Sequence, residues 1–139
     1  MRVYLDASVV VALVSDEAFS PRAEQLLSRS DLVLVFSDFA SAEATSAIAR
    51  RVRTGEMEAH HASIAFDRID DWTARVPDRV SLDSRDIAHA EAMLRTLDLS
   101  LRTPDAINLA IALRVADGLA TFDRQLARAA ESKGVPALS

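Results

Sequence analysis

The sequence of 139 residues predicts an α/β fold with a mainly parallel central sheet. Short apolar runs, typical of buried strands, alternate along the chain with longer segments of helical pattern. Strands that alternate with helices favour right-handed crossover connections and parallel pairing. No linker, internal repeat or low-complexity segment interrupts the pattern, so residues 1–139 are expected to form a single domain.

The first half of this alternation begins with a buried strand, Val3–Leu5, which ends at Asp6. A short helix is expected at Ser8–Val14. A second helix, Pro21–Ser28, follows Ser20, which is predicted to be its N-cap. The continuous apolar run Leu32–Phe36 predicts a strand covered on both faces.

A helical hairpin and a weak strand candidate form the middle of the chain. Its first helix is predicted at Phe39–Arg53 and ends before Gly55. Its second helix is predicted at Glu56–Trp72. Arg79–Leu82 is the weak strand candidate.

The C-terminal third repeats the alternation. Asp83 and Asp86 predict an acidic variant of the capping box at the start of a helix. The expected elements are that helix to Leu97, a helix at Asp105–Val115 opened by Thr103-Pro104, a strand at Leu119–Phe122 ending at Asp123, a helix at Arg124–Ser132 and an edge strand at Val135–Leu138.

The composition excludes several classes of protein. The net charge of −5 argues against a protein that coats nucleic acid through excess positive charge. The absence of cysteine excludes disulfides and thiolate metal sites. No apolar run approaches the ~20 residues needed to span a bilayer, and no signal peptide is recognisable. A soluble cytoplasmic protein is therefore expected. All basic residues except Lys133 are arginine, and genomic base composition is the simpler explanation.

Four acidic residues stand out by their placement. Asp6 and Asp123 each follow a predicted strand, Asp105 lies in the first turn of a helix, and Glu43 lies among apolar positions of the long helix. A buried carboxylate without a partner is costly, so a metal ion, an arginine or protonation must compensate Glu43. Each acid also has an ordinary interpretation: Asp6 and Asp123 as helix caps, Asp105 as a dipole-stabilising acid, and Glu43 as a partner of Arg50 or as a side chain reaching solvent.

The ordered set of motifs resembles the PIN-domain ribonucleases, and within them the VapC-type toxins of toxin–antitoxin pairs. The motifs are Leu5-Asp6-Ala7-Ser8, Glu43, Thr103–Ala110 and Thr121-Phe122-Asp123. The resemblance implies a three-layer α/β/α fold with a mainly parallel sheet of four or five strands. It also implies an acidic pocket that binds Mg²⁺ or Mn²⁺, cleavage of RNA, a homodimer, and inhibition by a VapB-like antitoxin.

The same resemblance places the family's acidic residues at Asp6, Glu43, Asp105 and Asp123. Its supporting polar positions are Ser8 and Thr121, with Asn108 as a further residue near the pocket. Clustered carboxylates repel one another, and a hard divalent cation with oxygen ligands relieves that repulsion. We therefore expect Asp6, Asp105 and Asp123 to bind the ion directly and Glu43 to act as a ligand or as a base for water.

The sequence pattern says less about the roles of the arginines, the histidines and the aromatic side chains. Arg50, Arg51 and Arg53 follow Glu43 on the same helix and are candidates for contacts to the RNA backbone, although a solvated helix end explains each of them singly. The three histidines lack ligand spacing and are expected to be structural. Trp72 and the phenylalanines are expected to be core residues and not a base-stacking platform.

Two other folds and two other roles were compared with this hypothesis. A haloacid-dehalogenase-type phosphatase needs a second aspartate where this chain has Ser8. A receiver domain needs a lysine after a late strand, and Lys133 is misplaced for that role. The remaining alternatives keep the PIN-like fold: an inactive binding scaffold, or a nuclease of housekeeping RNA processing.

Overall fold

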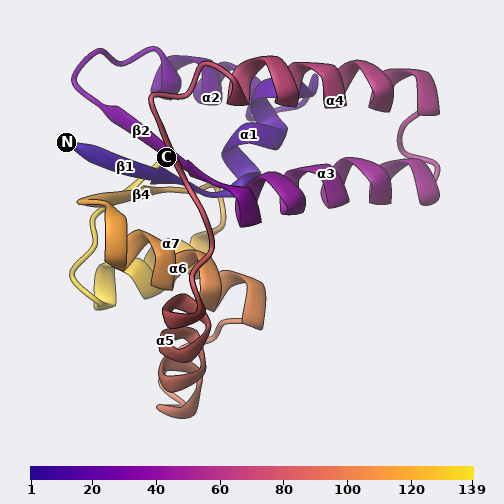
Figure 1. Cartoon of the computed structure of the whole chain (residues 1–139). Coiled ribbons are helices and arrows are strands. Elements are labelled where there is room, and N and C mark those ends of the chain that lie inside the picture. Colours follow the sequence, from indigo (N-terminus) through magenta and orange to yellow (C-terminus); the bar gives the residue numbers. More distant parts are fainter.

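A five-stranded, entirely parallel sheet forms the centre of the protein. The computed structural model describes all 139 residues and gives the strand order β3-β2-β1-β4-β5 (Figure 1). The strands are β1 (Arg2–Leu5), β2 (Val33–Ser37), β3 (Asp78–Val80), β4 (Gly118–Ala120) and β5 (Ala137–Leu138). The predicted α/β class with a parallel sheet is confirmed, and the weak candidates at both edges are strands.

Helices cover both faces of the sheet and complete three layers. They are α1 (Ala7–Val14), α2 (Ser20–Leu27), α3 (Asp38–Arg53), α4 (Ala59–Thr73), α5 (Ser84–Arg95), α6 (Thr103–Val115) and α7 (Arg124–Ser132). The first four pack against one another on one side, whereas α6 packs against α5, α7, β1 and β4 on the other (Figure 1). No helix is both long and apolar enough to cross a bilayer.

The core lies on both sides of β1, the middle strand. Val3, Tyr4 and Leu5 are fully buried because β2 and β4 flank this strand and helices cover it above and below. Helix α6 is buried at every position from Ala106 to Ala112. A helix that is buried on all sides needs small or apolar residues around its whole circumference. The exception in this stretch is Asn108, whose burial requires hydrogen-bond partners.

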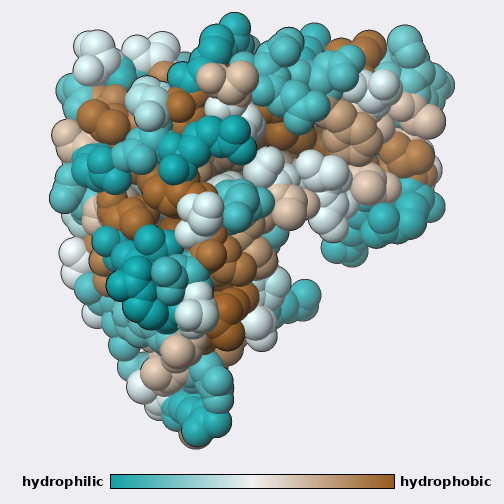
Figure 2. Space-filling model, in the orientation of Figure 1, coloured by the Kyte–Doolittle hydropathy of each residue, from teal (hydrophilic) through white to brown (hydrophobic).

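The helical hairpin of α3 and α4 extends beyond the sheet, and α5 extends away from it in a different direction (Figure 1). The surface is hollowed beneath α3, between the hairpin and the part of the molecule that carries α5 and α6 (Figure 2). The Asp83 capping box predicted for α5 is present, with both reciprocal hydrogen bonds. The buried carboxylate of Asp86 also binds Arg114 of α6 at 2.7 Å, which joins the two helices.

Several predicted boundaries were wrong. At the sheet edges, β3 ends at Val80 and not at Leu82, and β5 begins at Ala137 and not at Val135. Helix α4 begins at Ala59 and not at Glu56, and Phe19 rather than Ser20 is the N-cap residue of α2. Strand β4 ends at Ala120, so Asp123 does not terminate a strand. The reason is that the Thr121 hydroxyl accepts a hydrogen bond from the Asp123 amide, which turns the chain into α7.

Candidate active site

The four predicted acids lie around one cavity of about 450 Å³. Strand β1 brings Asp6 to its carboxyl end, α3 carries Glu43, the first turn of α6 carries Asp105, and the start of α7 carries Asp123. These elements meet beyond the carboxyl end of β1, the central strand. The carboxyl ends of parallel strands are where ligand sites form in open α/β sheets. The structure therefore brings the four acids to the lining of a single cavity.

Asp6 is the most buried of the four and is held by two hydroxyl groups. Its Oδ2 accepts hydrogen bonds from Ser8 Oγ at 2.6 Å and from Thr121 Oγ1 at 2.9 Å. Burial raises the pKa of Asp6, and these hydrogen bonds oppose that rise. Ser8 Oγ in turn accepts from the Phe122 amide at 3.1 Å, so its proton is directed toward Asp6. Both predicted supporting hydroxyls thus contact the first acid.

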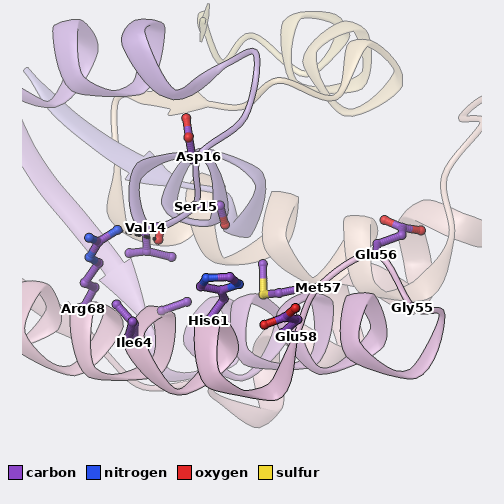
Figure 3. A pocket seen from close by; sticks show the side chains of 11 residues that line it. Val14, Ser15, Asp16, Gly55, Glu56, Met57, Glu58, His61, Ile64 and Arg68 are labelled. Atoms are coloured by element: carbon purple, nitrogen blue, oxygen red, sulfur yellow. Dashed lines mark hydrogen bonds between the residues drawn. The ribbon is translucent and has the colours of Figure 1, made fainter.

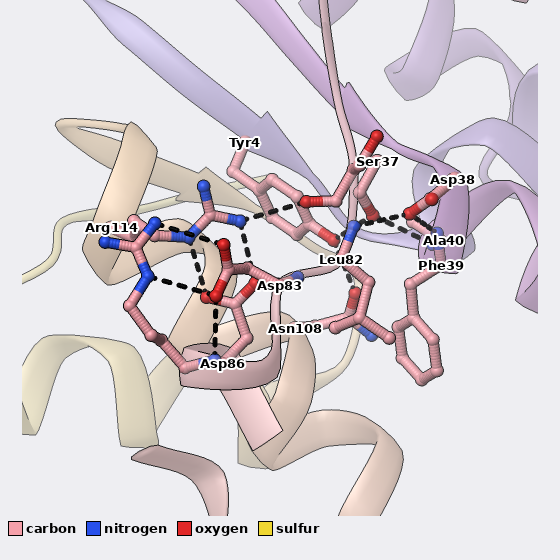
Figure 4. A network of polar contacts seen from close by, with 12 residues as sticks. Tyr4, Ser37, Asp38, Phe39, Ala40, Leu82, Asp83, Asp86, Asn108 and Arg114 are labelled. Carbon is pink, nitrogen blue, oxygen red and sulfur yellow. Dashed lines mark hydrogen bonds and ion pairs between the residues drawn. The ribbon is translucent and has the colours of Figure 1, made fainter. Parts of the chain in front are cut away.

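Glu43 is fixed by a chain of hydrogen bonds that reaches the middle of the sheet. Asn108 Nδ2 donates to Glu43 Oε1, and Tyr4 Oη donates to Asn108 Oδ1 at 2.6 Å. The Tyr4 hydroxyl has one proton, which it donates to Asn108. In its 2.6 Å hydrogen bond with Ser37 Oγ, the serine hydroxyl is therefore the donor and the tyrosine oxygen the acceptor. Figure 4 shows Tyr4, Ser37 and Asn108 directed toward one another.

Burial raises the pKa of Glu43 to about 7, against the opposing effect of the Asn108 hydrogen bond and with added repulsion from Asp6 and Asp105. A carboxyl group in this range changes its protonation near neutral pH, which is the property of a general base. The predicted pairing with Arg50 is not found, since the side chain contacts Asn108 instead. The side chain is only partly buried, so it still reaches solvent.

Asp105 and Asp123 complete the acidic wall from the two later helices. Burial raises the pKa of Asp105, a backbone hydrogen bond from Arg102 lowers it, and the charges of Asp123 and Asp6 raise it further. Asp123 Oδ1 accepts from the amides of Gln125 and Leu126 at 2.8 and 3.1 Å. Asp123 is thus the N-cap of α7, as its ordinary interpretation holds, and it also lines the acidic cavity.

Only one of the three predicted arginines lies at the acidic cavity. Arg51 lines it and binds Glu17 Oε2 at 2.6 Å. Arg50 lines a neighbouring hollow of about 700 Å³ along α3, to which Glu43 and Arg51 also contribute. Arg53 is exposed and lines neither space. Glu17 was missed from the sequence because nothing in its local pattern connects it to α3.

Almost the whole chain matches one known protein family. Residues 3–132 match the PIN domain. The chain belongs to the PIN domain family. No curated protein sequence matches this PIN domain.

Solved structures of the same fold align with nearly the whole PIN domain. VapC20 of Mycobacterium tuberculosis, a sarcin–ricin loop cleaving toxin, superposes with a TM-score of 0.73 at 18% identity, covering 91% of this chain and 94% of that one. VapBC2 of Rickettsia felis, bound to a promoter DNA fragment, gives 0.67 at 13% identity, with 99% and 98% covered. VapBC-1 of nontypeable Haemophilus influenzae gives 0.67 at 17% identity, with 100% and 98% covered.

The four acids of the PIN domain have the donor chemistry that a divalent cation requires. Their donor atoms suit Mg²⁺ or Mn²⁺, which prefer carboxylate oxygens. Asp6, Glu43 and Asp123 each use one oxygen in hydrogen bonds to the protein, which leaves the second oxygen for another partner. As the side chains are placed, no group of three or more His, Cys, Asp or Glu residues is close enough to hold an ion. The donor chemistry therefore fits, and coordination requires the carboxylates to draw together.

The largest cavity of the PIN domain, about 840 Å³, lies elsewhere, between the end of α1 and the turn of the α3–α4 hairpin (Figure 3). Its lining mixes apolar, basic and acidic groups, including His61 and Arg68, and none of the four acids belongs to it. Size alone does not indicate the functional cavity here, because the smaller one contains the four acids, and the pKa values of Asp6, Glu43 and Asp105 are raised. The three histidines lie outside that acidic cavity, and all of them are exposed.

Proposed function

We propose that this PIN domain is a metal-dependent endoribonuclease and the toxin component of a VapBC-like toxin–antitoxin pair. The observation that carries the proposal is the convergence of Asp6, Glu43, Asp105 and Asp123 on one cavity, with the pKa values of the first three raised. Such a cavity suits a reaction that needs a divalent cation and a proton acceptor at the same place.

The reaction is hydrolysis of an RNA phosphodiester bond by water. When bound, Mg²⁺ or Mn²⁺ neutralises charge on the scissile phosphate and lowers the pKa of the attacking water. Asp6, Asp105 and Asp123 would hold the ion. Glu43, whose pKa is about 7, accepts the proton that the water loses as its oxygen bonds to phosphorus and the phosphorus–oxygen bond of the leaving group breaks.

The polar residues around the acids position them for this reaction. Ser8 and Thr121 hold one oxygen of Asp6, and Asn108 holds one oxygen of Glu43. Because these donors are themselves fixed by further hydrogen bonds, the free carboxylate oxygens are presented to the cavity in a defined orientation. Preorganised polar groups of this kind cost little reorganisation during a reaction.

An acidic cavity needs nearby positive charge to hold RNA. Arg51 lies on the cavity wall and Arg50 lies along the adjoining hollow, so the path for the phosphate backbone runs from the acids along α3. Arg53 contributes only to the general charge at the end of that helix.

The proposed partners follow from the structural relatives. Two of them were determined as VapBC toxin–antitoxin complexes. A VapB-like antitoxin that covers the acidic cavity is therefore the proposed inhibitor, and a homodimer is the proposed assembly, in the cytoplasm.

The test is cleavage of a structured RNA by the purified chain, freed of any partner, in Mg²⁺, in Mn²⁺ and in EDTA. Cleavage that needs the ion and is lost in Asp6→Asn supports the nuclease. Asp16→Asn, an exposed aspartate outside the acidic cavity, is the matched control and should leave cleavage unchanged. A chain that binds RNA or an antitoxin but never cuts is the inactive scaffold, and equal cleavage by Asp6→Asn would assign the activity to a contaminant.

A further inference from the structure

Two phenylalanines at the rim of the acidic cavity are stacked on each other. The ring centroids of Phe19 and Phe122 are 4.8 Å apart, with an angle of 14° between the ring planes. Phe19 is 42% exposed to solvent and Phe122 is partly buried. The expectation that all phenylalanines are core residues was therefore wrong for Phe19. The pair could not be predicted from the local sequence pattern, because its members lie 103 positions apart.

The pair stands between two hollows whose linings differ in charge. On one side is the acidic cavity, and on the other is a smaller hollow of about 150 Å³ that is lined by Arg22 and Arg124 and by one acid, Asp123, which it shares with the acidic cavity. Phe19 and Phe122 contribute to both. The Arg22 guanidinium carbon lies 5.8 Å from the centroid of the Phe122 ring, and Arg22 also donates to Ser139 Oγ at 3.0 Å. Aromatic and cationic groups are thus adjacent beside the acids.

This combination matches the chemistry of single-stranded RNA. Unpaired bases stack on aromatic rings and on arginine planes, and the phosphates between them bind arginines. A base lying on the aromatic pair would have one neighbouring phosphate on the acidic side and the other on the side of Arg22 and Arg124. A base in a duplex is stacked between its neighbours and does not offer its face in this way.

We propose that Phe19 and Phe122 form a stacking site for one unpaired nucleobase next to the scissile phosphate, and that Arg22 and Arg124 bind the following phosphate. This inference rests on the proposed ribonuclease function. It adds to that function the residues that hold one unpaired base beside the scissile phosphate. The alternative is that Phe19 merely covers Phe122 and has no role in binding.

The test measures the affinity of a 12-nucleotide single-stranded RNA and of an RNA hairpin, whose stem is fully paired and whose loop is a non-nucleotide linker without bases, by fluorescence anisotropy, in EDTA so that neither is cut. Phe19→Ala is expected to weaken binding of the single strand about 5- to 150-fold, the range that one aromatic–base stack accounts for. Phe19→Trp retains an aromatic face and should bind it as tightly as the unsubstituted chain. Neither variant should change the affinity for the hairpin.

Two controls separate stacking from loss of structure. Ile87→Ala removes an equally exposed apolar side chain on α5, far along the chain from the pair, and should leave both affinities unchanged. An abasic position in the single strand, moved along it one nucleotide at a time, should weaken binding at one position only in the unsubstituted chain and at none in Phe19→Ala.

The two levels of the inference fail in different ways. Unchanged affinity of Phe19→Ala for the single strand, or an equal loss for single strand and hairpin, overturns the stacking site. In that case the unsubstituted chain still cuts RNA in Mg²⁺. A chain that neither binds nor cuts either RNA overturns the ribonuclease assignment itself.

Discussion

Replacing Glu43 by glutamine should stabilise the protein in the absence of metal, and more so at alkaline pH. The unfolded chain releases the Glu43 proton near pH 4.5, whereas the folded protein retains it to about pH 7. The folded state therefore binds the proton more tightly, and the stability that this contributes is present at low pH and is lost as the pH rises through this interval. Glutamine has no proton to lose and keeps an oxygen that accepts from Asn108.

The size of the effect follows from the same pKa values. A rise from 4.5 to about 7 corresponds to about 3.4 kcal/mol at about 1.36 kcal/mol per pKa unit. The Glu43 side chain is only partly buried, so solvent screening reduces this by roughly half, to about 1.7 kcal/mol. Glu43→Gln should exceed the unsubstituted chain in free energy of unfolding by about that amount at pH 8 and by only a small part of it at pH 5.

Urea denaturation in EDTA, followed by circular dichroism at pH 5, 6, 7 and 8, measures this difference. Glu24→Gln, an exposed glutamate on α2, is the matched control and should show no difference at any pH. A difference between Glu43→Gln and the unsubstituted chain that is constant with pH, or that grows toward pH 5, would refute the reasoning.

Three other outcomes are expected. Tyr4→Phe removes the hydroxyl that donates to Asn108 and should lower the free energy of unfolding by about 1–3 kcal/mol. It should also lower kcat for RNA cleavage more than it changes KM, because Glu43 loses its orientation. Equal kcat and KM in the variant and the unsubstituted chain would oppose this. Arg114→Ala leaves the carboxylate of Asp86 buried without its partner and should lower the free energy of unfolding by about 3 kcal/mol in a urea titration, and a loss below about 1 kcal/mol would show the pair to be marginal. Mg²⁺ at about 100 times its dissociation constant should stabilise the protein by about 2.7 kcal/mol in thermal unfolding, and EDTA should reverse the gain.

Much of the architecture could be predicted because it depends on local patterns. Apolar runs of strand length, caps such as Asp83 and Asp86, and the break at Gly55 act over a few residues, and the structure confirms the elements they indicate. The boundary after β4 could not be found in this way. Thr121 and Phe122 have strand propensity, but a side-chain hydrogen bond from the Asp123 amide to Thr121 decides where the strand ends.

In the candidate site, too, features that depend on local sequence could be predicted, and contacts between distant residues could not. The positions of Asp6, Glu43 and Asp105 relative to their own strand or helices could be inferred, whereas Asp123 begins α7 and does not end β4; the four do line one cavity. The contacts between distant elements could not. Tyr4 looked like an ordinary strand residue, although its hydroxyl orients Asn108 and through it Glu43. The proposed role of Phe19 likewise depends on its stacking with Phe122, which the fold brings beside it.

The position of β1 in the middle of the sheet has a consequence for how the protein is made. This strand is synthesised before its neighbour β4, and the Thr121 hydroxyl that holds Asp6 is encoded 115 codons later. A nascent chain that stops short of β4 therefore cannot assemble the acidic centre, since both its fourth carboxylate and the strand that completes it are still missing. Under the proposed function, this order of synthesis delays any cleavage of RNA until α7 has been made.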